Sequence, residues 1–273
     1  MLGYAGLAIA VMVAAILIAV GWQYWRFDRA IRAEVERVAA ASGEAVVVSE
    51  AMLAGLPEPA QRFLRHSGVV GRPIPQVIRT RQQGRIRSAA NSGWMNFEAE
   101  QIYSTNPPAF VWRVSMPRRS MALAIGRDAY LDGRGSILIK LLGVVPVAAE
   151  DGPELREAAL LRYLNETMWF PAALLLPGIA IAAIDDGSFR ATIRDGSAIA
   201  SGVFFIDPQG RATNFRAHRF DTGARQVNDW ETPIAAYKSF AIGELPAGGA
   251  AVWKRSDGAF SYIELEITDV RHQ

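Results

Sequence analysis

Short segments in which apolar and polar residues alternate fill the chain after residue 76, and turn residues separate most of them. Successive side chains of a β-strand point to opposite faces of a sheet, so the alternation predicts strands with one buried face. Short strands that follow one another through tight turns form an antiparallel meander. The strands expected late in the chain cover residues 179–184, 188–194, 198–206, 211–220, 228–240, 250–254 and 260–268. The predicted fold class is therefore α+β, mainly antiparallel, with residues 76–273 forming one unit.

A hairpin is expected at residues 97–116, and it places its largest side chains on one face. Asn106-Pro107-Pro108 provides the turn between its strands. Residues two apart on a strand share a face, so the first strand and the second each present one large apolar row. The interior set predicted from these rows consists of Phe97, Gln101, Tyr103, Phe110, Trp112 and Met116.

A helical segment is expected at about 153–176, where it interrupts the strands. Pro153 stands near its start and Pro171 near the end of its first helix. An apolar stripe at helical spacing predicts that the segment packs against the sheet; the stripe consists of Leu160, Leu161, Leu164 and Met168. Tyr163 and Trp169 are assigned to the lining of the same interior.

Charged residues gather in this central part of the chain, and they allow two interpretations. Arg127 follows an apolar row on one strand face, so its side chain is predicted to enter the interior, where an unpaired charge is costly. Glu166 is its expected partner, although Arg162, one helical turn earlier, could hold Glu166 instead. The catalytic interpretation assigns Asp128 and Glu166 to acid–base chemistry, with Arg127 as electrostatic stabiliser, because neighbouring buried carboxylates acquire separated pKa values.

The start of the chain carries no charge from residue 2 to residue 20. A helix of about nineteen residues at a rise of about 1.5 Å spans roughly the 30 Å of a bilayer core. We predict a transmembrane anchor at residues 1–22 rather than a signal peptide, because no basic region precedes the apolar run. Trp22, Tyr24 and Trp25 follow as an interfacial belt, and juxtamembrane and lead-in helices are expected within residues 23–75. Arginines just after the belt favour a cytoplasmic domain at the cell membrane.

Composition and motifs argue against several classes of function. The net charge is only +2, with 29 basic and 27 acidic residues, which argues against nucleic-acid binding. The chain has no cysteine, so it has neither disulfides nor thiolate chemistry. Three histidines are too few for a zinc site or a catalytic triad, and no glycine loop fits a phosphate. We therefore expect no metal and no cofactor, and we interpret His218 as a surface or hydrogen-bonded strand residue rather than a general base.

The first expected strand has one strongly basic face, with arginines at 79, 81, 85 and 87. One interpretation is that this face attracts anionic headgroups. The other is that the strand lies at the outside or edge of the sheet, where charge prevents pairing with other molecules. We favour the second.

The chain resembles an uncharacterised bacterial family that is known only as a domain of unknown function. The resemblance covers the whole domain and rests on Leu56-Pro57-x-Pro59, Trp94-Met95-x-Phe97, Phe110-Val111-Trp112, Arg127-Asp128-x-Tyr130, Arg162-Tyr163-Leu164-x-Glu166, Trp169-x-Pro171 and Ile267-Thr268-Asp269. It implies no known reaction. The chain departs from the family pattern at residues 181–183, where a tryptophan is expected. More distantly, the chain looks like the half-barrel of the lipoprotein carriers that shield acyl chains, which implies a curved sheet wrapped on a central helix.

Three functional hypotheses follow. The leading one is a membrane-anchored half-barrel that binds or shields a lipid-like ligand in an apolar cavity, without catalysis. The second is a hydrolase or isomerase of a hydrophobic substrate that uses Asp128, Glu166 and Arg127. The third is a membrane-tethered scaffold with a filled core. The expected partners are the membrane and a hydrophobic small molecule, and the oligomeric state stays open.

Overall fold

The computed structural model describes residues 2–118 and 121–273. Fourteen antiparallel strands form one sheet in the order β6-β5-β4-β3-β2-β1-β14-β13-β11-β10-β9-β8-β7, and β12 pairs with β13 outside this path. The strands are β1 (Val77–Ile86), β2 (Met95–Thr105), β3 (Pro108–Arg118), β4 (Met121–Leu131), β5 (Arg134–Leu141), β6 (Val145–Asp151), β7 (Ile179–Asp185), β8 (Ser188–Asp195), β9 (Ala198–Ile206), β10 (Ala212–Asp221), β11 (Gln226–Glu231), β12 (Ile234–Phe240), β13 (Gly243–Arg255) and β14 (Gly258–His272).

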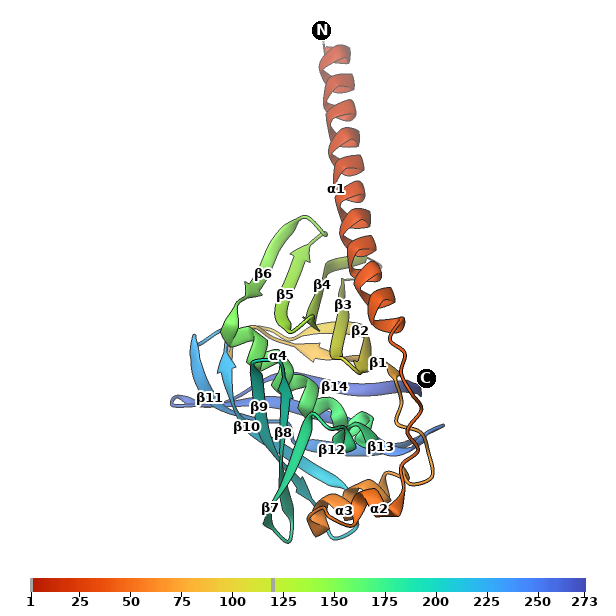
Figure 1. Ribbon diagram of the computed structural model, residues 1–273. Coiled ribbons are helices and arrows are strands. Elements are labelled where there is room, and N and C mark those ends of the chain that lie inside the picture. The colour runs from red at the N-terminus through yellow and green to blue at the C-terminus, as the bar shows by residue number, and fades with distance from the viewer. Residues whose placement is uncertain (1, 119–120) are drawn as a thin grey trace.

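The sheet curls around the helix α4 (Pro153–Glu166), as Figure 1 shows. Two short 3₁₀ turns follow, η1 (Thr167–Trp169) and η2 (Pro171–Leu175), because proline at the start of the second turn cannot continue the helix. α4 approaches β5 closely at Gly135, where an added Cβ would lie 2.3 Å from the Leu155 carbonyl oxygen. The predicted half-barrel, wrapped on a central helix, is confirmed.

The order of strands differs from a simple meander at two places. One is β12, which lies outside the path, so that β11 pairs with β13. The other is the last strand. β14 returns to pair with β1, and this pairing joins the early and late strands into one sheet. The arginine-rich strand β1 therefore lies in the middle of the sheet, and the prediction of an outer or edge strand was wrong, because local sequence does not reveal so distant a partner. Its basic face is solvated and ion-paired: Arg85 lies 2.7 Å from Glu264, and Arg81 lies 3.6 Å from Glu100.

Two predicted segments have different boundaries in the structure. Residues 228–240, expected as one strand, form β11 and β12, which separate at Thr232 and Pro233 because proline has no N–H for the ladder. β13 extends well before residue 250 and pairs with β12 on this added stretch.

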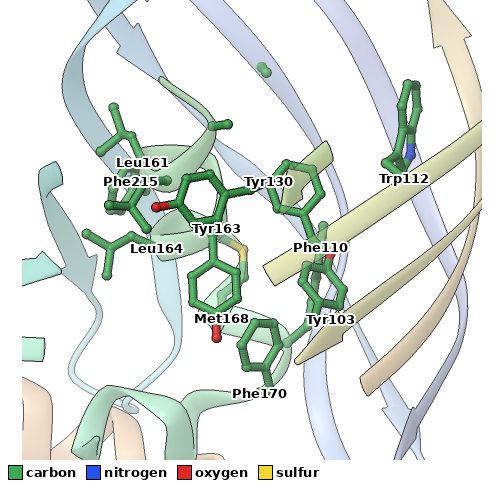
Figure 2. Close-up of a cluster of buried hydrophobic side chains, with 14 of the residues drawn as sticks. Tyr103, Phe110, Trp112, Tyr130, Leu161, Tyr163, Leu164, Met168, Phe170 and Phe215 are labelled. Atoms are coloured by element: carbon green, nitrogen blue, oxygen red, sulfur yellow. The ribbon is translucent and has the colours of Figure 1, made fainter. Parts of the chain in front are cut away.

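The concave face of the sheet and α4 enclose the main core. Tyr163 of α4 lies among aromatic rings from the sheet and the following turns, with its ring centroid 5.6 Å from that of Phe170. The Phe170 ring lies 4.9 Å from Tyr103. Figure 2 shows this cluster beside Leu161 and Leu164, with Trp112 set apart from it. The lead-in helices α2 (Glu50–Leu53) and α3 (Glu58–His66) close the far end of the core, where the Phe63 ring lies 6.2 Å from that of Phe204.

The opposite face of the sheet is covered over three strands by the helix α1 (Leu2–Ala39). Its last turns bury Ile31 and Val38 against Ile102, Val111 and Ala129 of β2, β3 and β4. Its first part extends away from the domain, as Figure 1 shows. α1 is long and apolar enough to cross a membrane. The parts of β2 to β4 that contact α1 are consequently buried on both faces.

Candidate functional site

A cavity of about 290 Å³ lies between α4 and the concave face of the sheet. Its walls come from the first strands on one side and from β10, β11, β13 and β14 on the other. Most of the lining is apolar, and its aromatic members are Trp112, Trp169, Phe220, Trp230, Trp253, Phe260 and Tyr262. An apolar hollow of this size with a few polar groups is the usual form of a small-molecule site.

The polar part of the wall is organised by one buried arginine on α4. The Arg162 Nε donates a hydrogen bond of 2.8 Å to Glu166 Oε1, one helical turn later. Its Nη1 donates to Asp128 Oδ2 of β4 at 2.6 Å. The guanidinium carbon also lies 5.1 Å from the ring centroids of both Phe110 and Trp112. Arg162 therefore bridges two carboxylates that come from different elements.

Side-chain amides extend this network across the sheet. Gln101 Nε2 of β2 donates to Glu166 Oε2 at 2.8 Å, so both oxygens of Glu166 have donors. Gln82 Nε2 of β1 donates to Gln101 Oε1 at 3.0 Å, and Trp112 Nε1 donates to Gln82 Oε1 at 3.0 Å. A buried polar network is stable only when its polar atoms have hydrogen-bond partners, and most atoms of this network have one.

The pKa values of the network follow from burial and pairing. Burial raises the pKa of Glu166 above its ordinary value, although the Arg162 charge and the hydrogen bonds from Arg162 and Gln101 act against that rise. For Arg162, burial lowers the pKa, but the charges of Glu166 and Asp128 outweigh it and the pKa is raised. Arg162 is therefore charged at every working pH. Asp128 Oδ1 is buried and has no hydrogen-bond partner among the described residues.

Some of the site residues predicted from the sequence line the cavity, and others do not. Asp128, Glu166, Trp112 and Trp169 line the cavity. Other members of the predicted set are buried in the core beside the cavity and outside its lining, namely Phe97, Gln101, Tyr103, Phe110, Met116 and Tyr163. Their role as ligand contacts stays a prediction.

Arg127 is where the sequence prediction was wrong. Its side chain points away from the cavity, toward α1, and its Nε lies 2.6 Å from Glu34 Oε2. Its Nη1 donates to the Ser136 hydroxyl at 2.6 Å. The interior row of β4 holds Asp128 and Tyr130 instead. Because α1 buries the other face of β4, apolar residues occur on both faces, and alternation alone does not tell which face is the interior.

The sequence also missed the late strands as a source of lining residues. Trp230, Trp253 and Phe260 were assigned only to strands, yet they form one wall of the cavity. Alternation places each of them on the buried face of its strand, but the pairing of β14 with β1 is what brings that face opposite Trp112. His218 lies on the outer face, 83% exposed, with its Nδ1 2.6 Å from Asp229. The described residues contain no cluster of His, Asp and Glu that could hold a metal ion.

Comparison with known proteins identifies a family. A family of unknown function (DUF6544) matches residues 46–265, in agreement with the predicted resemblance to an uncharacterised family. No curated protein matches the chain. The chain is similar in fold to a LolA superfamily protein from Nitrosomonas europaea, at 9% identity and a TM-score of 0.45, over 84% of this chain and 94% of that chain. It is also similar to a DUF1329 family protein from Desulfovibrio piger, at 7% identity and a TM-score of 0.42, over 79% of this chain and 92% of that chain. Likenesses this weak say nothing about a ligand.

Proposed function

We propose a function for this chain from the geometry of its cavity, because the chain belongs to the DUF6544 family, whose function is unknown. The protein is a membrane-anchored binder of a hydrophobic, lipid-like molecule that occupies the space between α4 and the sheet. The observation that carries the proposal is the hollow of about 290 Å³ between α4 and the sheet, which is lined mostly by apolar side chains. Protein interiors are close-packed, so a hollow lined by indole and phenyl rings is a site for apolar atoms.

The arrangement of the charged groups supports binding over catalysis. Both oxygens of Glu166 accept hydrogen bonds, from Arg162 and from Gln101. A general acid or base must reach the proton that it transfers, and Glu166 would first have to break these bonds. Arg127, the proposed electrostatic stabiliser of the catalytic alternative, faces α1. The carboxylates are thus explained as partners of Arg162 without a reaction.

Membrane anchoring by α1 is supported by the way this helix joins the domain. Ile31 is 1% exposed in the contact with the sheet. Asp28 accepts hydrogen bonds of 2.9 and 2.6 Å from Arg113 of β3. A signal peptide is cut away from the mature chain, whereas this helix continues without a break into a segment that the domain needs for its packing. We therefore propose a single-pass anchor, and the arginines that follow it favour a cytoplasmic domain, which a reporter fused after Gln273 tests directly.

The binding proposal predicts that the purified chain carries lipid. The full chain, extracted in mild detergent, should release lipid that mass spectrometry detects, and added lipid should displace it. Ala251→Phe places a ring in the cavity, because Ala251 lines it, and should abolish lipid retention while the fold is kept. Ala235→Phe, at an exposed position of β12, is the matched control and should retain lipid. A wild-type chain that is empty and takes up no added lipid would refute the proposal.

A further inference from the structure

Three arginines, Arg87, Arg219 and Arg255, line one end of the cavity and are named here the arginine cluster. They follow or belong to β1, β10 and β13, respectively. The guanidinium carbons of Arg87 and Arg255 lie 5.4 and 4.6 Å from the ring centroid of Phe260. That of Arg219 lies 5.6 Å from the ring centroid of Trp253, which pairs with Phe260 across β13 and β14. The three positive groups therefore surround two neighbouring rings.

The arginine cluster has more positive charge than its carboxylate partner neutralises. Asp221 accepts a hydrogen bond of 2.7 Å from Arg255 Nε, and burial, which alone would raise its pKa, is outweighed by this bond and by the Ala224 N–H, so the pKa is lowered. Arg87 and Arg219 take part in no ion pair among the described residues. One carboxylate thus faces three guanidinium groups, which leaves two positive charges uncompensated.

The remaining hydrogen bonds hold these groups in place without neutralising them. Arg87 Nε donates to the Ser261 carbonyl oxygen at 2.8 Å and its Nη1 to the Ala90 carbonyl oxygen at 3.1 Å, so its Nη2 stays open to a ligand. Arg219 Nε donates to the Ala158 carbonyl oxygen at 3.1 Å. Each guanidinium is thus fixed through Nε and an aromatic ring. A guanidinium fork held in this way is suited to a carboxylate or a phosphate, and a half-buried positive charge without a counter-ion is costly.

We propose that the ligand is a single-chain amphiphile with an anionic headgroup, whose carboxylate or phosphate binds the arginine cluster while its chain fills the apolar part of the cavity. This inference rests on the proposed function. The volume of about 290 Å³ stands at the lower end of the range for ligand pockets, which suits one chain better than a two-chain lipid.

Photolabelling of the full chain in phosphatidylcholine nanodiscs tests the headgroup. A diazirine-bearing fatty acid and the matching fatty alcohol are compared, with labelling of the peptides around Trp253 and Phe260 measured relative to labelling of α1, which reports partition into the bilayer. The acid should label the cavity about tenfold more than the alcohol, the equivalent of one charge-assisted hydrogen bond. Unlabelled dodecanoate and dodecyl phosphate, used as competitors, distinguish the two headgroups.

Variants on the two faces of β10 make the test specific. Arg219→Gln should remove most of the preference for the acid, and Arg219→Lys should restore part of it. Arg216→Gln is the control, because Arg216 lies on the outer face, and Glu231, its partner, keeps Lys254 at 2.7 Å. Equal labelling by acid and alcohol, unchanged in Arg219→Gln, would overturn the headgroup assignment and leave the cavity proposal intact. Labelling of the cavity by neither probe would overturn the proposed function itself.

A second inference concerns the turn between β5 and β6, which carries an apolar surface of its own. Four exposed apolar residues of this turn and of the start of β6, named here the β5–β6 tip, are Leu142, Val144, Val145 and Val147, at 37%, 37%, 54% and 60% exposure. The turn contacts α1: a Cβ added to Gly143 would lie 2.7 Å from the Tyr24 Cα. Nearby, the Lys140 ammonium lies 4.5 Å from the ring centroid of Phe27. Figure 1 shows the β5–β6 hairpin rising beside α1.

The geometry points to the β5–β6 tip as a second membrane contact. Tyr24 directly follows the apolar part of α1, within the aromatic belt that marks the headgroup region. A turn that touches α1 at Tyr24 lies at the same depth, where exposed valine and leucine side chains gain from burial in lipid. Two contacts, one by α1 and one by the tip, would hold this edge of the half-barrel on the bilayer.

Depth measurements on the full chain test this contact, since a chain without cysteine accepts single cysteines cleanly. Fluorophores at Val147→Cys, Val227→Cys and Ile18→Cys are compared for quenching by nitroxide lipids in vesicles. Position 147 should be quenched almost as strongly as position 18, and position 227, which is 63% exposed on β11, should not be. Quenching at 18 without quenching at 147 would overturn the tip contact alone. No quenching at 18 would overturn the anchor and with it both statements.

Discussion

Arg162 is the residue whose removal tests the interpretation of the site most directly. Arg162→Met keeps an unbranched apolar stem and removes the charge that holds Asp128 and Glu166, at 2.6 and 2.8 Å. Breaking a buried ion pair by removing one partner costs about 3–5 kcal/mol, because the other charge stays buried. For a domain of this size such a loss lowers Tm by roughly 6–20 °C, at about 2–4 °C per kcal/mol.

The loss in Arg162→Met should depend on pH, with a sign that follows from Glu166. Burial already raises the pKa of Glu166 above the ordinary 4.5, and Arg162 is the main influence that lowers it. Without Arg162 that pKa rises further, so the folded variant holds a proton that the unfolded chain releases above pH 4.5. The deficit in unfolding free energy is then full above the pKa of Glu166 in the variant, shrinks as the pH falls through that pKa, and becomes constant below the lower pKa that Glu166 has in the wild-type chain.

Unfolding of the full chain in mild detergent, followed by tryptophan fluorescence from neutral to mildly acid pH, measures this effect. Combining Arg162→Met with Asp128→Asn and Glu166→Gln removes the stranded charges and should recover most of the stability. Glu166→Gln alone leaves Arg162 paired with Asp128 and should cost less than Arg162→Met. A deficit below about 1 kcal/mol, the value for an exposed ion pair, or one that does not change with pH, would refute the assignment of Arg162 as the buried centre of the network.

Two further predictions concern packing and titration. Gly202→Ala should destabilise the protein by about 1–3 kcal/mol, because its Cβ would lie 2.0 Å from the Phe215 ring. Gly93→Ala is the control and should have little effect, because a Cβ at Gly93 would meet nothing within 4 Å. Chemical denaturation of both variants measures the difference. Burial lowers the pKa of His272 below 6.5. Below that pH the unfolded chain binds a proton at His272 that the folded chain does not bind, so the free energy of unfolding decreases as the pH drops through 6.5. His272→Gln should flatten this part of the stability profile, and an unchanged slope would count against it.

The strands were predictable because their signals are local. Asp132 and Gly133 end β4 in a turn with φ of 51° and 70°, as the Asp-Gly pair indicates. The proline residues that begin α4 and η2 likewise mark those boundaries in the sequence. The sequence did not reveal the pairing between distant strands, such as β1 with β14, because the residues of a strand do not specify which other strand it pairs with. The error over β1 as an edge strand has this cause.

The site was predictable only in part, for the same physical reason. Glu166 and Arg162 share a helix at a spacing of one turn, so their pairing could be anticipated as one of two alternatives. Whether Glu166 pairs with Arg162 or with Arg127 depends on which face of β4 points into the core. Alternation is informative when one face of a strand is solvated, and α1 removes that contrast by covering the second face.

β4 links the anchor to the cavity through two successive residues. Arg127 points to one side and forms the ion pair of 2.6 Å with Glu34 of α1. Asp128 points to the other side and accepts the hydrogen bond of 2.6 Å from Arg162 of α4. Successive side chains of a strand cannot change faces independently, so the position of α1 and the position of the polar wall are fixed by the same backbone. A ligand in the cavity is therefore held at a set distance from the bilayer in which α1 is proposed to lie.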